Sequence, residues 1–216
     1  MPFTQFRSSS GMRFKDRIQA ATHLSEKLLK YKNTDGVVLA IPRGGMPLGA
    51  VVSKNLNLPL SILLSKKIGH PANKEYAIGA VTLFGLHLNE NAASVSKDYL
   101  ESETEKIRSN LLSRQNLFLG NKPLPSIKDK IAIIIDDGIA TGETIIAGIQ
   151  QLRSQEPKKI IVAVPVSAKD TAYKIAQQTD EFICLYLPED FKGVGEFYEN
   201  FEQVSDDEVI AILKEH

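Results

Sequence analysis

Five stretches of the chain are dominated by branched apolar residues and lack polar alternation. They cover residues 36–41, 58–65, 131–135, 158–166 and 181–187. Apolar runs of this kind are typical of strands that are buried on both faces, as in a parallel sheet covered by helices. Each run stops at a turn of polar, glycine or proline residues. We therefore predict five buried strands of one sheet.

Apolar residues at helical spacing separate these runs. They predict helices over residues 13–31, 47–56, 145–153 and 169–178. Strands that alternate with helices of this length indicate a doubly wound, mostly parallel α/β sheet flanked by helices. We expect one domain over residues 1–216, with its core at about 36–187 and a loop at 8–11.

Residues 68–126 interrupt the alternation. We expect an inserted excursion here, with a loop at 69–73, a hairpin from 77–83 and 85–89, and a charged helix over 95–119. Near the end of the chain, Ser205 precedes Glu208 at the spacing of a capping box, which predicts a terminal helix.

Two adjacent acids, Asp136 and Asp137, follow the third apolar run. Ligands of parallel α/β sheets bind beyond the carboxyl ends of the strands, so these acids should lie at a ligand site. The small-residue loop 138–142 then opens a helix whose free N–H groups favour a phosphate. Because carboxylates repel phosphate, the acids must bind another part of the ligand, either sugar hydroxyls or a divalent cation. A ribose 5-phosphate unit has this layout.

A second strand end has a related design. Residues 36–41 run into Pro42, Arg43, Gly44 and Gly45, and a helix follows. Glycines allow the backbone to approach a ligand closely, and a guanidinium binds a diphosphate through two hydrogen bonds. Both loops lack the lysine of a Walker A motif and the spacing of a dinucleotide-binding glycine motif.

The segment from Asp136 to Thr144 resembles the phosphoribosyl diphosphate (PRPP) binding motif of type I phosphoribosyltransferases. The resemblance implies that Asp136 and Asp137 hold the ribose hydroxyls. Gly138 departs from the usual pattern, where an aliphatic residue or Ser is common, and is expected to loosen the loop. The residues implied to bind the 5-phosphate are Gly138, Ile139, Ala140, Thr141, Gly142, Glu143 and Thr144.

The resemblance also implies a pyrophosphate site formed by Arg43, Gly44, Gly45 and a lysine. Lys66 and Lys67 follow the second apolar run, and Lys67 is the preferred one because it resembles the basic residue of the family at this strand end. The implied catalytic residues are Asp136, Asp137, Arg43 and Lys67. Mg²⁺ is the expected cofactor, bound through PRPP, with Asp136 and Asp137 as candidate contacts.

The function implied is that of a Mg-dependent phosphoribosyltransferase, a pentosyltransferase that moves the 5-phosphoribosyl group of PRPP to a nitrogenous, purine-like base and releases pyrophosphate. A hood from residues 188–204 and the N-terminus would cover the base. Phe191 and Tyr198 are base-binding candidates, although these aromatics would equally fill a small core. One alternative is a non-catalytic regulatory protein that binds PRPP or a nucleotide, and another is a PRPP-hydrolysing enzyme.

Four further residues have weaker roles. His70 is a candidate acid or base, or simply an exposed loop histidine, and Lys169 is a candidate base contact or a solvated lysine. Arg108 or Arg114 would reach phosphate, from this chain or from a neighbouring subunit.

Charge and cysteine content exclude other classes. Lys plus Arg and Asp plus Glu number 26 each, so the formal net charge of zero offers no general attraction to nucleic acid or anionic membranes. No apolar run approaches the ~20 residues of a membrane span, and the N-terminus lacks the apolar segment of a signal peptide. We expect a cytoplasmic homodimer with no nucleic-acid or membrane partner. Cys184, the single cysteine, lies in an apolar run and is predicted to pack in the core.

Overall fold

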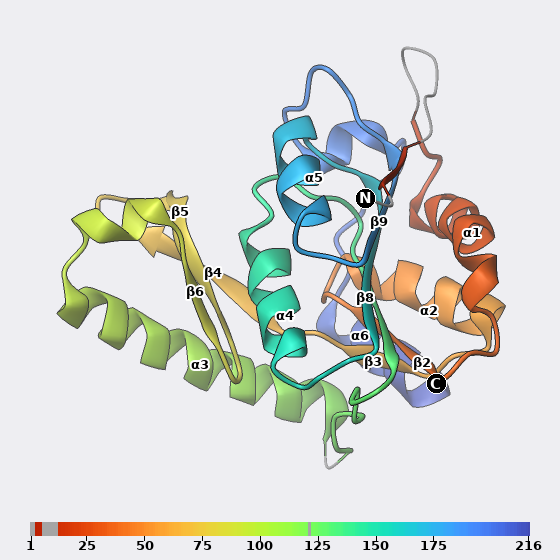
Figure 1. Cartoon of the computed structure of the whole chain (residues 1–216), viewed down its shortest axis with the longest axis horizontal. Helices are drawn as coiled ribbons and strands as arrows, with labels where there is room; N and C mark the ends of the chain where they lie inside the picture. Colours follow the sequence, from red (N-terminus) through yellow and green to blue (C-terminus); the bar gives the residue numbers. More distant parts are fainter. Residues whose placement is uncertain (1–2, 6–12, 121) are drawn as a thin grey trace.

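The structure is a computed structural model that describes residues 3–5, 13–120 and 122–216. Six parallel strands form a central sheet with helices on both faces (Figure 1). This arrangement confirms the predicted doubly wound α/β fold. The strands, in their order across the sheet, are β1 (Phe3–Gln5), β9 (Glu181–Tyr186), β8 (Lys159–Val166), β7 (Ile131–Ile135), β2 (Gly36–Ala40) and β3 (Leu60–Ile62).

Apolar side chains cover both faces of this sheet, which explains the unbroken apolar runs. Val38 and Ile133 face a core that is closed by α1 (Arg17–Leu28) and α2 (Gly45–Leu56). Leu39 and Ile134, one residue further along, face a second core that is closed by α4 (Glu143–Arg153) and α5 (Lys169–Ala176). Figure 1 shows these two helix pairs on opposite sides of the sheet.

The chain changes direction between β2 and β7. These strands are neighbours in the sheet, with Ala40 paired to Ile135. From β2 the chain continues outward to β3, whereas from β7 it continues the other way to β8 and β9. The loops that follow β2 and β7 therefore diverge over a crevice, which is where ligands bind in sheets of this kind.

The excursion is more ordered than predicted. It forms a three-stranded antiparallel sheet of β4 (Ser65–His70), β5 (Asn73–Thr82) and β6 (Leu86–Leu88), the 3₁₀ turn η2 (Glu90–Ser94) and the long helix α3 (Lys97–Leu119). The expected loop at residues 69–73 was wrong, because β4 continues to His70 and the chain turns at residues 71–72. The expected hairpin is confirmed as β5 and β6, and the helix as α3.

The N-terminal segment packs against the last strand and the residues that follow it. Strand β1 pairs in parallel with β9, although the polar N-terminal sequence predicted no strand. Phe14 forms a parallel bridge with Tyr198, which follows the 3₁₀ turn η3 (Val194–Phe197). Residues 199–204, here called the strap, connect this region to α6 (Asp206–Glu215), whose capping box is confirmed. The loop predicted at residues 8–11 lies outside the described residues.

Cys184 is fully buried, as predicted, and burial raises the pKa of its thiol to about 12. The helices can also be compared with the requirements of a membrane span. None of the helices in the described part of the chain combines the length and the apolar character needed to cross a bilayer.

Candidate functional site

The loops after β2 and β7 meet where the chain changes direction in the sheet, here called the switch point, and glycines make this possible. A Cβ atom on Gly45 would lie 2.7 Å from the carbonyl oxygen of Ile135. A Cβ atom on Gly44 would lie 2.0 Å from Oδ2 of Asp137. Neither position has room for a side chain. The loop after β2 can therefore reach the acidic end of β7 only because it contains two glycines.

The acids Asp136 and Asp137 are held in an unfavourable environment for negative charge. Burial, reinforced by the neighbouring Asp137, raises the pKa of Asp136 well above its usual range. Burial also raises the pKa of Asp137, although the Arg17 guanidinium opposes this effect. Asp136 Oδ1 accepts a hydrogen bond from the Asp137 N–H at 2.8 Å. Hydroxyl donors or a cation from a ligand would stabilise both carboxylates.

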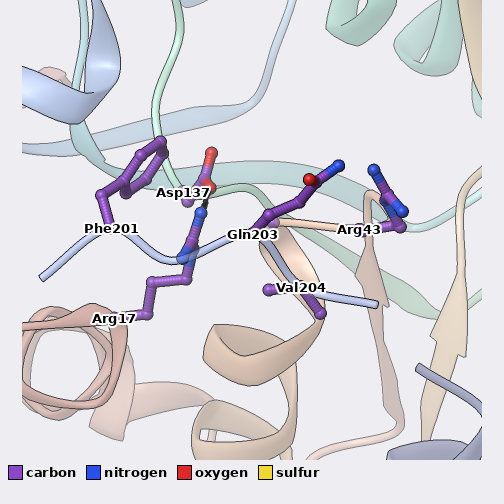
Figure 2. Close-up of a pocket in the computed structure, with 7 residues that line it drawn as sticks. Arg17, Arg43, Asp137, Phe201, Gln203 and Val204 are labelled. Carbon is purple, nitrogen blue, oxygen red and sulfur yellow. Dashed lines mark hydrogen bonds and ion pairs between the residues drawn. The ribbon is translucent and has the colours of Figure 1, made fainter. Parts of the chain in front are cut away.

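Arg17 is a site residue that the sequence analysis did not single out. It lies at the start of α1, and its Nε and Nη2 atoms lie 3.0 and 2.9 Å from Asp137 Oδ2. Its Nη1 donates to the carbonyl of Glu202 in the strap at 2.7 Å, and its guanidinium lies 3.9 Å from the centre of the Phe201 ring. Figure 2 shows the guanidinium directed at Asp137 with Phe201 beside it. Arg17 thus links the acid to the strap.

We expect Arg17→Ala to lower the free energy of unfolding by roughly 1–3 kcal/mol, because it leaves the mostly buried Asp137 carboxylate without its cation. Without Arg17 the pKa of Asp137 should rise further. The destabilisation should therefore shrink as the pH falls and Asp137 becomes protonated. Urea unfolding at several pH values measures both effects. A loss of stability that does not change with pH would contradict the role given to this ion pair.

The loop after the acids has the geometry of an anion cradle. Gly142 precedes α4 with a φ of 78°, a conformation that favours glycine. Among the described residues, no backbone carbonyl accepts from the amides of residues 140–144. These free N–H groups stand at the N-terminus of an eleven-residue helix, where a phosphate is favoured.

Two members of the predicted phosphate loop have other contacts. The Ile139 N–H donates to the carbonyl of Val166 at 2.9 Å, so this amide is used by the fold. The Glu143 carboxylate turns toward β6, where it lies 3.2 Å from Asn89 Nδ2 and 3.5 Å from His87 Nε2. The backbone amide of Glu143 thus stays at the loop while its side chain anchors the excursion.

Gly138 has a packing reason in this fold. A Cβ atom here would lie 2.6 Å from Cγ1 of Val194 and 2.9 Å from Cγ1 of Val166. Val194 therefore occupies the space that a larger residue at position 138 would need. The structure gives no sign that the glycine loosens the loop; η3 packs against it instead.

The two candidate lysines have different surroundings, and the role given to Lys67 stays a prediction. Both lysines belong to β4, where successive side chains point to opposite faces. The Lys67 ammonium lies 2.8 Å from a carboxylate oxygen of the exposed Glu75. Lys66, in contrast, lines a cavity of about 500 Å³ together with Arg43. The structure therefore places Lys66, and not Lys67, beside the loop that carries Arg43.

The aromatic candidates differ in their surroundings. Tyr198 is buried, with ring contacts to Phe14 and Phe201, and its hydroxyl donates to the carbonyl of Asp137 at 2.7 Å. Its ring is thus not open to a base, and Tyr198 supports the acidic turn instead. Phe191 stacks on Phe197 at a centroid distance of 5.6 Å, and its role as a base contact stays a prediction.

Two weaker candidates have contacts of their own. His70 ends β4, and its Nδ1 accepts a hydrogen bond from the Ala72 N–H in the following turn. Lys169 lies 3.4 Å from the exposed Glu189 carboxylate. These contacts account for both side chains without a catalytic or base-binding role.

A cavity of about 300 Å³ opens beside Asp137 (Figure 2). The side chains around it come from α1, the loop after β2, the acidic turn and the strap, so it collects segments from across the sequence. Its residues are Arg17, Arg43, Gly44, Asp137, Phe201, Gln203 and Val204. Arg43 also lines the larger cavity with Lys66, and it therefore stands between the two spaces.

Comparisons with known proteins agree with this geometry. A family model described as "Phosphoribosyl transferase domain" matches residues 13–201. Two curated Mycobacterium tuberculosis proteins, each named "Putative phosphoribosyl transferase", are 36% identical over 204 residues. The match covers 93% of this chain but 46% of theirs, so the chain spans about half the length of these relatives.

Solved structures are also similar. A crystal structure of a Thermus thermophilus protein has a TM-score of 0.83 and 34% identity, and the match covers 94% of this chain and 99% of that one. A hypothetical protein from Neisseria gonorrhoeae, solved with bound ppGpp, has a TM-score of 0.52 and 13% identity, with 98% and 97% of the chains covered. The second likeness concerns the fold alone.

Proposed function

The chain belongs to the phosphoribosyl transferase domain family, and from this premise we propose that it transfers the 5-phosphoribosyl group of PRPP to a nitrogenous base, purine-like in type, with release of pyrophosphate. The observation that carries the proposal is the loop after β7. It places two mostly buried carboxylates next to free helix N-terminal amides, at the switch point of the sheet. A sugar phosphate is complementary to both parts.

In this proposal each part of PRPP has its own partner. The amides of residues 140–144 bind the 5-phosphate, and Asp136 and Asp137 accept hydrogen bonds from the ribose hydroxyls. Both Arg17 contacts fall on Asp137 Oδ2, which leaves Oδ1 for the sugar. The loop of Arg43, Gly44 and Gly45 binds the diphosphate, and Lys66 replaces Lys67 as its lysine partner.

The reaction breaks the bond from C1 of the ribose to the pyrophosphate oxygen and forms a bond from C1 to a ring nitrogen of the base. The base gives up a proton, and pyrophosphate leaves with the electron pair. Positive charge on the sugar is greatest after the bond to pyrophosphate has broken and before the bond to the base has formed. The nearby carboxylates stabilise the sugar most at this point. Arg43 offsets the negative charge that builds on the leaving group.

The acids are partly suited to bind the expected Mg²⁺ ion. Carboxylate oxygens are suitable ligands, but Asp137 Oδ2 is engaged by Arg17. Among the described residues, no group of three His, Cys, Asp or Glu side chains is placed to hold a metal. These facts support an ion carried by PRPP, with Asp136 and Asp137 as candidate contacts. When bound, the ion would neutralise charge on the diphosphate.

Pyrophosphate release tests this proposal against its rivals. The protein is incubated with PRPP, Mg²⁺ and a panel of purine and pyrimidine bases, and pyrophosphate is measured. A transferase releases it only with an acceptor base. A regulatory protein of the same fold would bind PRPP in calorimetry and release nothing. A hydrolytic enzyme would release pyrophosphate with no base present.

We expect Arg43→Ala to lower turnover by roughly 100-fold, because Arg43 stabilises charge that develops on the leaving group. Affinity for ribose 5-phosphate should stay nearly unchanged, since this ligand has no diphosphate. Single-turnover kinetics and calorimetry measure the two quantities. Equal losses in both would remove Arg43 from the leaving group.

A further inference from the structure

The contact between the excursion and the start of α4 carries a further inference. We propose that His87 of β6 and Asn89, which follows this strand, are positioning residues for phosphate binding: together they hold the Glu143 carboxylate away from the free amides of residues 140–144. The identity of the bound anion as the 5-phosphate of PRPP rests on the proposed function. The excursion would thus act on the phosphate site without touching the ligand.

Glu143 would compete with a phosphate if its side chain were free. It is the first residue of α4, and its backbone amide is one of the free N–H groups at this helix terminus. The same N–H groups and the helix dipole attract a negative side chain in the first turn. An unrestrained Glu143 carboxylate would therefore fold toward these amides, and its charge would repel a phosphate bound there.

In the structure this carboxylate is held by the excursion instead. Its Oε1 accepts a hydrogen bond from Asn89 Nδ2 at 3.2 Å, and its Oε2 lies 3.5 Å from His87 Nε2. Oε2 is buried, and no hydrogen bond from the described residues reaches it, so the histidine ring is placed to compensate its charge. The side chains of His87 and Glu143 are 19% and 15% exposed, and solvent therefore screens this contact weakly.

Asn89 is itself fixed by hydrogen bonds to the excursion. Its N–H donates to the carbonyl of Ile78 at 3.1 Å, and its Nδ2 donates to the carbonyl of Ala77 at 3.1 Å as well as to Glu143. Its Oδ1 accepts from the Asn91 N–H at 3.0 Å. These contacts determine which end of the side-chain amide faces the carboxylate, and they present a donor to it.

A second contact fixes the next residue of the helix. Ser65 Oγ, at the start of β4, donates to the carbonyl of Thr144 at 2.9 Å. Helix α4 stands between the small sheet of β4, β5 and β6 and the central sheet (Figure 1). The excursion therefore holds the first two residues of α4, Glu143 and Thr144, through groups other than their amides. Those amides stay free for an anion.

Calorimetry with ribose 5-phosphate tests the inference through a double-mutant cycle. We expect His87→Ala to lower the affinity roughly fivefold or more, because the Glu143 charge is left uncompensated beside the bound phosphate. Glu143→Gln should raise the affinity about two- to threefold, since it removes a negative charge near the phosphate. When Glu143→Gln is already present, His87→Ala should cost less than about twofold, because no carboxylate remains to be held.

Two further variants separate this role from packing. His23→Ala is the matched control, since His23 also pairs with a glutamate, at 3.8 Å from Glu26 Oε2, but on an exposed part of α1. It should change the affinity less than about twofold. His87→Gln keeps an N–H donor for Glu143 and should restore most of the affinity that His87→Ala loses. In steady-state kinetics with PRPP, His87→Ala should raise KM and leave kcat within about twofold, because the 5-phosphate is bound equally before and during the reaction.

Circular dichroism checks that each variant is folded, and Asn89→Ala replaces His87→Ala if the latter is not. The inference is overturned if the wild type does not bind ribose 5-phosphate, or if His87→Ala has no more effect than His23→Ala. It is also overturned if His87→Ala weakens binding equally with and without Glu143→Gln, because the histidine then acts through packing alone. The proposed function fails separately: ribose 5-phosphate binding that shows the expected coupling, without transfer to any base, leaves the positioning role in place and removes the reaction.

Discussion

Asp137→Asn is expected to weaken PRPP binding by more than about tenfold, since a hydrogen bond to a charged group contributes about 1.5–3 kcal/mol. The variant removes the negative charge that faces the ribose but keeps an oxygen that can accept from Arg17. The link between α1, the acidic turn and the strap should therefore survive. Calorimetry with PRPP and Mg²⁺ measures the affinity, and thermal unfolding shows that the fold is kept.

A matched control exists at the other end of the sheet. Asp180 also pairs with an arginine, at 2.8 Å from Nη1 of Arg153, but it lies outside both cavities. Asp180→Asn should leave PRPP affinity within about twofold, because a partly exposed ion pair contributes at most about 1 kcal/mol to stability and nothing to the ligand. If Asp137→Asn binds PRPP as tightly as this control does, the assigned role of the acids is wrong.

Asp136→Asn should stabilise the protein and abolish transfer. Burial raises the pKa of Asp136, so the folded state holds its negative charge only at a cost in stability. An asparagine keeps the oxygen that accepts from the Asp137 N–H and removes the charge. Removal of this unfavourable charge is expected to add roughly 0.5–2 kcal/mol to the free energy of unfolding. Turnover should fall below detection, because the sugar loses a carboxylate.

The pH dependence gives this prediction a sign. A carboxyl group with a raised folded pKa binds more protons in the folded state than in the unfolded state, so its contribution to stability is complete below the unfolded value of about 3.9 and is lost as the pH rises through the folded pKa. The advantage of Asp136→Asn should therefore be absent at low pH and grow toward neutral pH. Urea unfolding across this range measures it. A variant less stable than the wild type at neutral pH would contradict the interpretation.

The sequence alone was sufficient for the fold class and for the two loops at the switch point. Strands such as β7 and β2 are buried on both faces, so their sequences are unbroken apolar runs. Such a run can be recognised from consecutive residues alone. Local chemistry also marks the loops, because Gly44, Gly45 and Gly142 stand where the backbone approaches closely or takes a positive φ. Such features depend on a few consecutive residues, and they can be predicted from a pattern.

Only the tertiary structure decided which charged side chains join the site. Arg17 and Asp137 are 120 positions apart, and Asn89 and Glu143 are 54 apart. Their pairing depends on how α1, α4 and the excursion pack around the sheet. Lys66 and Lys67 are adjacent and chemically identical, and they were separated only when β4 proved to be a strand with two faces. The sequence around a charged surface residue does not reveal its partner. The interaction energy of two charges depends on the distance between them in space and not on their neighbours in the chain.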